Sequence, residues 1–413
     1  MGNLKNISKL FSANVIAQAL GVMVYPLLTR LYQPEDFGVM NLFLTVGSIL
    51  TLVAVLDLHN ALPLPEENKG ALSLFKAGAY SLVVVVFAVI LFIPFIGFFS
   101  AELVNVWWMM PIYVAVVGMW QLVSFYMNRD KQFGKIASYQ VLQSSSNSLL
   151  KIVFGYLSPS GFFLVVASLL GQMIAFVSVS TKKLKGIFTE LKTITSSDIR
   201  FYLDKYREFP LYAFPKNLLV QLSNGLPVMI LSSAFDMKEI GYFSLAMTIG
   251  FLPIQMIANS IYQVMLQTVS EKVNRKEKIG GYIVKFIKYS CAGLIPAFVV
   301  LYFCLPLVTE WMFGDGWGRT GEVLRLLLPW CFATYMLSSL VFIPEVLIKL
   351  KGNLAIEIVN ILVRLLVIEI AIYFDNFMLA MLLIGVSTFV IRMAQLFWFV
   401  SLTKRYDDSL AVR

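Results

Sequence analysis

The sequence has few charged residues and few of the side chains on which enzyme chemistry depends. Charged residues make up 14% of the 413 residues and apolar residues 59%, whereas globular domains carry about 25% and about 45–50%. The single histidine, His59, argues against a histidine-based catalytic triad. The three cysteines lie in apolar stretches, so neither a disulfide framework nor a metal site is expected. A Walker-type phosphate loop is also missing, and we expect no cofactor.

Long apolar segments dominate the chain instead. A transmembrane helix needs about 20 mostly apolar residues. Lys5 and Lys9 precede the first apolar run, which is too long for a signal peptide and is expected to remain as a spanning helix. We predict an all-α polytopic membrane protein with about 12 transmembrane helices, at residues 10–30, 37–60, 77–99, 107–127, 136–157, 160–180, 209–234, 240–268, 282–308, 323–347, 354–374 and 377–402.

The distribution of Lys and Arg predicts the orientation of these helices. With the N-terminus inside, the inner segments carry 25 of the 33 Lys and Arg residues and the outer segments carry four. Positive charge accumulates on the cytoplasmic side of membrane proteins. We therefore expect both termini on the cytoplasmic side of the membrane. The net charge of +9 comes from residues between the apolar segments, which indicates a protein oriented in a lipid bilayer rather than one that binds nucleic acid.

An internal repeat divides the chain. Residues 14–38 align with residues 217–241 without a gap, at a shift of 203, so that Asn14 matches Asn217 and Gly38 matches Gly241. Such repeats are common in transporters. We predict two homologous six-helix bundles, residues 1–180 and 209–413, around a central hydrated cavity. A cytoplasmic linker, residues 181–208, joins them. It contains either an interfacial amphipathic helix or a solvated one, with Ser197 as its cap.

Polar side chains recur at helical spacing inside several expected spans. Such groups are costly in a bilayer and usually face a bundle interior or an aqueous cavity. The spans at 77–99, 160–180 and 282–308 lack such a stripe, as lipid-facing helices would. Hydrogen bonds between helices in a dry bundle are the alternative. The candidate cavity-lining residues are Asn14, Gln18, Gln143, Asn147, Asn217, Gln221, Asn224, Gln255, Asn259 and Asn360.

Ionisable residues mark the same spans. The cations within them are Lys151, Lys216, Arg364 and Arg392, and Arg30 stands at the expected outer end of the first span. Deep cations without an evident acid on the same helix suggest an anionic guest. Lys216 follows two prolines, and a bend there can free backbone groups and open the helix to water. The alternative is that the Lys216 side chain extends to the inner membrane surface. Candidates for coupling to H+ or Na+ are Asp57, His59, Glu357 and Glu369.

Three stretches carry a resemblance to a known family. These are LTRLYQPEDFG (residues 28–38), FDMKEIGYFSLAM (residues 235–247) with the following FLPIQMIANSIYQVMLQ, and FGDGWGRTGEVLRLLLP (residues 313–329). The chain resembles the Wzx-type polysaccharide transporters, which flip O-antigen and capsule repeat units. They share a superfamily, MOP, with MATE exporters and MurJ-type flippases. The expected MurJ-type arginine and aspartate cluster is missing from the first span.

The resemblance implies a V-shaped pair of bundles and a specific cargo. That cargo is an undecaprenyl-pyrophosphate-linked oligosaccharide, moved from the inner to the outer leaflet by alternating access. The polymerase and the chain-length regulator of the same pathway are candidate partners. We expect the five cations to hold the pyrophosphate and the amides to bind the sugars.

Three other functions stay open at this point. An ion-coupled exporter of drugs or small molecules would need a cavity dominated by acids, whereas here deep cations are at least as numerous. A scaffold of the glycan-assembly complex would co-purify with it without transporting anything. A membrane glycan polymerase or ligase would need a large outer loop, and the longest outer loop, residues 309–322, is short. We therefore predict a transporter and not an enzyme.

Overall fold

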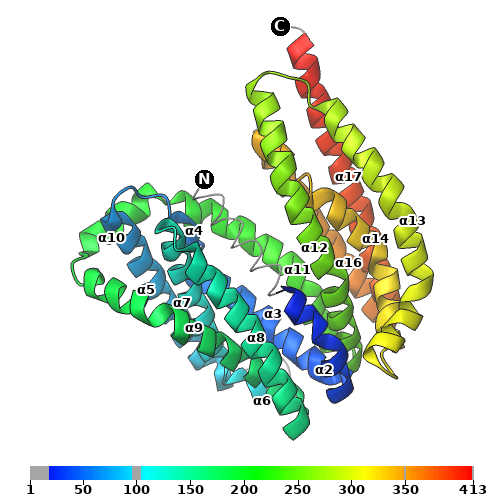
Figure 1. Cartoon of the computed structure of the whole chain (residues 1–413), viewed down its shortest axis with the longest axis horizontal. Coiled ribbons are helices and arrows are strands. Elements are labelled where there is room, and N and C mark those ends of the chain that lie inside the picture. The colour runs from blue at the N-terminus through cyan, green and yellow to red at the C-terminus, as the bar shows by residue number, and fades with distance from the viewer. Residues whose placement is uncertain (1–17, 95–103, 348–349, 412–413) are drawn as a thin grey trace. The chain divides into compact units, whose positions relative to one another are not determined.

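The computed structural model describes residues 18–94, 104–347 and 350–411, and every regular element within these ranges is a helix (Figure 1). The chain forms two compact units, residues 1–241 and 242–413. The first contains α2 (Tyr25–Leu31), α3 (Pro34–Val55), α4 (Leu58–Ala61), α5 (Asn68–Phe92), α6 (Val104–Trp107), α7 (Met110–Arg129), α8 (Phe133–Leu157), α9 (Gly161–Leu191), α10 (Ser196–Lys205), the π-helix η2 (Phe209–Ala213) and α11 (Phe214–Ala234). The second contains most of α12 (Met237–Asn274), then α13 (Gly280–Phe313), α14 (Gly318–Ser338), α15 (Ile343–Val346), α16 (Leu350–Tyr373) and α17 (Phe377–Ala411).

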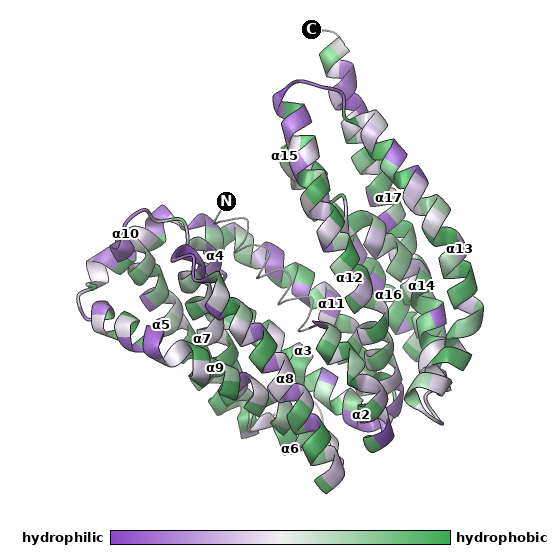
Figure 2. Cartoon of the chain, in the orientation of Figure 1, coloured by the Kyte–Doolittle hydropathy of each residue, from purple (hydrophilic) through white to green (hydrophobic). Residues whose placement is uncertain are grey.

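The all-α polytopic class predicted from the sequence is confirmed. Each expected span from residues 37–60 onward overlaps with at least one helix, and Figure 2 shows these helices rich in hydrophobic residues. Seven helices of the described part are long and apolar enough to cross a membrane: α3, α5, α7, α9, α12, α13 and α17. The more polar α8, α11, α14 and α16 are not among them, so the count of 12 stays a prediction. The predicted bundle limits at residues 180 and 209 likewise stay predictions.

The expected helix over residues 37–60 is broken. α3 ends at Val55, and Leu56 and Asp57 both take the left-handed conformation, with φ of 50° and 58°. Asp tolerates this conformation better than most residues, because its short polar side chain can bond locally. His59 therefore lies on the separate short helix α4 and not on α3.

The linker is more helical than expected, and its cap was assigned to the wrong residue. α9 continues to Leu191, well into the predicted linker. Thr195, not Ser197, is the N-cap of α10: its hydroxyl accepts from the Asp198 amide, while the Asp198 carboxylate accepts from the Thr195 amide. This reciprocal pair satisfies two amide groups that a helix start leaves open.

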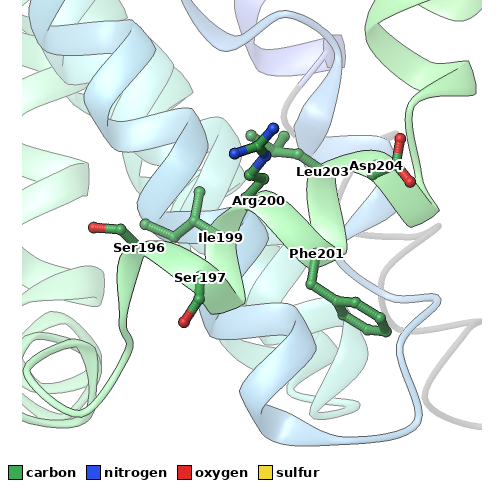
Figure 3. A pocket seen from close by; sticks show the side chains of 7 residues that line it. All are labelled: Ser196, Ser197, Ile199, Arg200, Phe201, Leu203 and Asp204. Carbon is green, nitrogen blue, oxygen red and sulfur yellow. The ribbon is translucent and has the colours of Figure 1, made fainter.

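The linker helix α10 is docked on the start of α5. Tyr202 is buried there and donates a hydrogen bond to Glu67 at 3.0 Å, and Asp198 pairs with Lys69 at 2.7 Å. The side chains of Arg200 and Phe201 point to different sides of α10 (Figure 3). A surface hollow of about 860 Å³ lies on α10, and none of the predicted site residues lines it.

The two copies of the repeat's acidic turn pack against each other within the first unit. A Cβ on Gly241 would lie 1.7 Å from the Pro34 carbonyl oxygen, and one on Gly38 would lie 2.4 Å from the Met237 carbonyl oxygen. Backbone oxygens cannot move aside as flexible side chains do. Glycine is therefore required at both positions so that the starts of α3 and α12 can cross.

In the second unit, α14, α16 and α17 pack together and α13 flanks them. The start of α13 is held by Asp407 of α17, whose carboxylate accepts from the amides of Ile279 and Gly280 at 2.8 and 2.9 Å. Only 6% of the most apolar window of α13 is buried in the described protein. This helix, at the span 282–308 that lacks a polar stripe, has the exposure expected of a lipid-facing helix.

Candidate functional site: polar groups within the membrane helices

The polar stripe of α8 lies inside the first unit. Gln143, Asn147 and Lys151 follow one another at one-turn spacing, so they share a face. Gly171 of α9 lies against the backbone of Asn147. A Cβ atom added to Gly21 would lie 3.7 Å from the hydroxyl oxygen of Ser144, so this part of the chain is also close to α8. The stripe is therefore covered by neighbouring helices rather than facing lipid.

Lys151 is a buried cation near the C-terminal end of this stripe. The residue is 9% exposed, and its carbonyl oxygen accepts a hydrogen bond from the Tyr32 hydroxyl at 2.8 Å. Within the described residues, no carboxylate or other acceptor pairs with its ammonium group. A buried unpaired charge is strongly unfavourable. Lys151 is therefore a buried cation without a counter-ion among the residues that the structure describes.

A second polar group joins α11 to α3 and α4. Asp57 is 1% exposed and accepts from the side-chain amides of Asn217 at 3.1 Å and Asn60 at 2.8 Å. One turn further along α11, Gln221 donates to the Ser48 hydroxyl at 2.6 Å. These two predicted sugar-binding residues form hydrogen bonds between helices, which is the arrangement that the dry-bundle alternative describes.

His59 lies next to this group. Its Nε2 atom is 3.9 Å from the Asp57 carboxylate, and its ring packs edge-on against Phe125 with 4.8 Å between centroids. Burial lowers the pKa of His59 from its usual 6.5, and the nearby Asp57 charge opposes this shift.

The second unit contains a partly buried ion pair between α16 and α17. The Arg392 guanidinium donates to both carboxylate oxygens of Glu357, with 3.1 Å from Nη2 to Oε2. It also donates to Gln395 Oε1 at 2.8 Å, and the Gln395 amide in turn donates to Asn353 Oδ1 at 2.6 Å. The bidentate geometry fixes both side chains. The structure thus brings together two predicted residues, Glu357 and Arg392, that the sequence had left without partners.

Arg364 lies beside this pair and is 1% exposed. Its guanidinium stands 4.7 Å from the centre of the Trp330 ring of α14 and donates to the Thr388 hydroxyl at 3.2 Å. It is within electrostatic range of both Arg392 and Glu357. Two guanidinium groups and one carboxylate thus lie together inside the bundle. Asn360, also 1% exposed, lies one turn before Arg364 on α16.

The other predicted site residues lie on exposed surfaces or outside the described residues. Gln255 and Asn259 are exposed on α12 and hydrogen-bond each other at 3.1 Å. Gln18 is partly exposed on the helical turn before α2, and Asn14 lies outside the described residues. Four more of the predicted site residues are exposed: Arg30, Lys216, Asn224 and Glu369.

Sequence reasoning missed four residues of the second cluster: Asn353, Trp330, Thr388 and Gln395. Two of them carried a signal. Asn353 precedes Glu357 by one turn and Gln395 follows Arg392 by three residues, so both extend polar faces already recognised. Trp330 and Thr388 carried none, because an aromatic and a hydroxyl residue are ordinary in membrane helices.

Comparison with known proteins identifies the family. Residues 27–321 match the model of a family described as "Polysaccharide biosynthesis protein". The chain belongs to this family. The succinoglycan biosynthesis transport protein ExoT of Rhizobium meliloti (strain 1021) is 21% identical over 338 residues. That alignment covers 79% of this chain and 66% of the relative, so the chain spans somewhat less than two thirds of its length.

Two solved structures show which fold this family member has. The lipid II flippase MurJ, in an inward closed conformation, superposes with a TM-score of 0.75 at 13% identity, covering 98% of this chain and 91% of the other. An inward-facing MATE family transporter of the MOP superfamily gives a TM-score of 0.70 at 15% identity, covering 98% and 99%. The fold is therefore that of the MOP superfamily, and the chain is a multi-pass membrane protein. The resemblance to polysaccharide transporters noted in the sequence is confirmed.

Proposed function

We propose that this chain flips an undecaprenyl-pyrophosphate-linked oligosaccharide repeat unit from the inner to the outer leaflet of the bacterial cytoplasmic membrane. It would do so by alternating access, for assembly of a surface polysaccharide such as O-antigen or capsule. Membership of the polysaccharide biosynthesis family and the MOP fold support a transporter with no catalytic step. The observation that carries the proposal is Lys151, a buried cation whose ammonium group has no partner within the described residues.

The cargo's pyrophosphate and this chain's buried cations have complementary charges. Lys151 in the first unit offers one positive charge. In the second unit, Arg364 and Arg392 are two cations that lie close to Glu357 inside the bundle. Phosphate oxygens accept charge-assisted hydrogen bonds that are about twice as strong as neutral ones. Arg30 and Lys216, both exposed, would guide the anion at the ends of its route.

The membrane potential favours the proposed direction of transport. An inside-negative potential drives negative charge outward by about 2.3 kcal/mol per charge per 100 mV. Coupling to H+ or Na+ would add to this force, and Asp57, His59, Glu357 and Glu369 are the titratable candidates. With both termini in the cytoplasm, α10 would lie on the inner surface. The polymerase and chain-length regulator of the pathway would meet the protein at the membrane.

The test combines a gene deletion with substitutions at Lys151. The deletion strain should lose the surface polymer and accumulate single lipid-linked repeat units, measured by mass spectrometry. Lys151→Met should fail to restore export at normal expression, because it removes the charge and keeps the side-chain length. Lys151→Arg should restore part of it, and Lys185→Met, at an exposed lysine of α9, should restore all of it.

Two results would overturn the proposal. One is normal surface glycan with Lys151→Met at equal expression. The other is a deletion strain with unchanged glycan and unchanged lipid-linked pools. If that deletion strain also became sensitive to cationic toxins, an exporter of small molecules would replace the flippase. Co-purification with the assembly enzymes without any transport defect would indicate a scaffold.

A further inference from the structure

Several amide side chains on α7 and α8 have no hydrogen-bond partner among the residues that the structure describes. Gln121, Gln140, Gln143 and Asn147 make no side-chain hydrogen bond within the described residues. The side-chain oxygens of Gln121, Gln140 and Asn147 are also shut off from solvent. In native proteins the large majority of buried polar side-chain atoms are paired. Unpaired acceptors gathered on two neighbouring helices therefore need an explanation.

The same residue types are paired elsewhere in the protein. Asn217, Gln221 and Gln395 each donate a hydrogen bond to a side chain of a neighbouring helix. A general shortage of partners in an apolar bundle does not account for the unpaired amides, because amides in equally apolar helices find them. The unpaired ones are concentrated on one part of the first unit.

An aromatic pair lies beside these amides. Trp120 of α7 stacks on Tyr139 of α8, with ring centroids 3.4 Å apart and planes at 10°. Tyr139 is buried, and its hydroxyl donates to Gln172 Oε1 of α9 at 2.5 Å, which fixes the ring. Trp120 is partly exposed, so part of its ring remains available. Gln121 and Gln140 are the next residues after the two stacked rings.

This combination has the chemistry of a sugar site. The face of an aromatic ring is electron-rich and attracts the C–H bonds of a pyranose. Side-chain amides offer both donors and acceptors, which match the hydroxyl groups of a sugar. The partly exposed ring of Trp120 and the four amides carry no charge, so the part of a ligand that they suit is uncharged. Along α8, Lys151 comes one turn after Asn147, and about 16 Å separates it from Gln140 at 1.5 Å per residue.

We propose that Trp120, Gln121, Gln140, Gln143 and Asn147 form a glycan track that binds the uncharged sugars of the cargo. Lys151 holds the phosphate end of the same molecule. This inference rests on the proposed function, because it assigns one part of the lipid-linked oligosaccharide to these residues. It adds the substrate class: sugars with free hydroxyl groups and no carboxylate or ammonium where they contact the track.

The test is a binding measurement on the purified full chain in lipid nanodiscs. One probe is the lipid-linked oligosaccharide extracted from the deletion strain, and the other is undecaprenyl pyrophosphate without sugar. Gln140→Leu and Asn147→Leu should each weaken binding of the first probe about tenfold. They should leave binding of the second probe unchanged. Lys151→Met should weaken both, and Asn128→Leu, at an exposed amide of α7, should weaken neither.

Thermal stability distinguishes a binding role from a structural one. An apolar side chain that replaces an unpaired buried amide removes a desolvation cost. Gln140→Leu and Asn147→Leu should therefore unfold at the same temperature as wild type or a higher one, while binding less glycan. Trp120→Phe should keep more affinity than Trp120→Leu, because it retains an aromatic face.

Three results would overturn the glycan track. These are wild-type affinity for the oligosaccharide probe in the two leucine variants, equal losses for both probes, and a lower unfolding temperature in those variants. A different result would overturn the proposed function itself, and the track with it: wild-type protein that binds neither probe. The two failures are thus distinguishable.

Discussion

Removal of Glu357 should destabilise the second unit more than removal of its partner Arg392. The two side chains are 15% and 16% exposed, so the pair is largely buried. Glu357→Gln removes the carboxylate that pairs with Arg392. Breaking a buried pair in this way costs about 3–5 kcal/mol.

Arg392→Gln should cost less, because Glu357 still has a cation nearby. Glu357 and Arg364 are seven residues apart on α16 and share a face, so the carboxylate keeps one nearby cation. The Gln395 and Asn353 amides also remain paired with each other. We expect a cost of only about 1–3 kcal/mol, the range for one unsatisfied group. The double variant Glu357→Gln/Arg392→Gln removes both charges and should lie within about 1 kcal/mol of wild type.

The assay is thermal unfolding of the detergent-solubilised protein, followed by intrinsic fluorescence. For a unit of this size, 1 kcal/mol corresponds to about 2–4 °C, so Glu357→Gln should lower Tm by roughly 10 °C. An exposed acid of the same helix, Glu369→Gln, is the matched control and should change little. The reasoning fails if Arg392→Gln is as damaging as Glu357→Gln, or if the double variant shows the sum of both losses.

Three further predictions concern the first unit. Burial lowers the pKa of His59 from its usual 6.5, so the unfolded chain takes up a proton at a higher pH than the folded protein does. The free energy of unfolding should therefore be unaffected by this group above pH 6.5 and should decrease as the pH falls below it. His59→Phe should abolish this decrease, measured as Tm against pH. Thr195→Ala removes the cap of α10 and should cost about 0.5–2 kcal/mol, seen as faster amide exchange confined to α10. Gly241→Ala should prevent normal folding, because its Cβ would meet a backbone oxygen at 1.7 Å, whereas Gly186→Ala, in open space on α9, should raise stability by up to about 1 kcal/mol. Equal Tm values for these two glycine variants would contradict the packing argument.

Hydropathy predicted the helices well because bilayer thickness imposes a minimum length on every span. It predicted their ends less well. The break after Val55 depends on two residues in the left-handed conformation, and Leu56 gives no signal of it. The cap of α10 was misassigned by two residues, since Ser197 and Thr195 both have a suitable hydroxyl and only the geometry decides between them.

The candidate site was predictable in its residue types but not in its pairings. Spacing on one helix showed that Glu357 and Arg364 share a face, yet the closer partner of Glu357 is Arg392, which lies 35 residues further along the chain. Asn217 and Gln221 had the spacing of a cavity stripe, and they bond to α3 and its following turn instead. Periodicity identifies the face of a helix, whereas the partner of that face depends on how separate helices pack.

The pairing state of each polar group then distinguishes structural from functional roles. Asn217, Gln221 and Gln395 are satisfied within the protein, and a ligand could bind them only by breaking an existing bond. Lys151 and the amides of the glycan track have no such bond to break within the described residues. A cargo that carries its own phosphate and hydroxyl groups would recover the cost of burying them. Substrate recognition in the first unit should therefore depend on α7 and α8 more than on α11, although α11 also carries Asn and Gln side chains at helical spacing. Gln221→Leu should consequently lower stability without changing the affinity for either probe. Gln140→Leu should weaken binding of the oligosaccharide probe alone, without lowering stability.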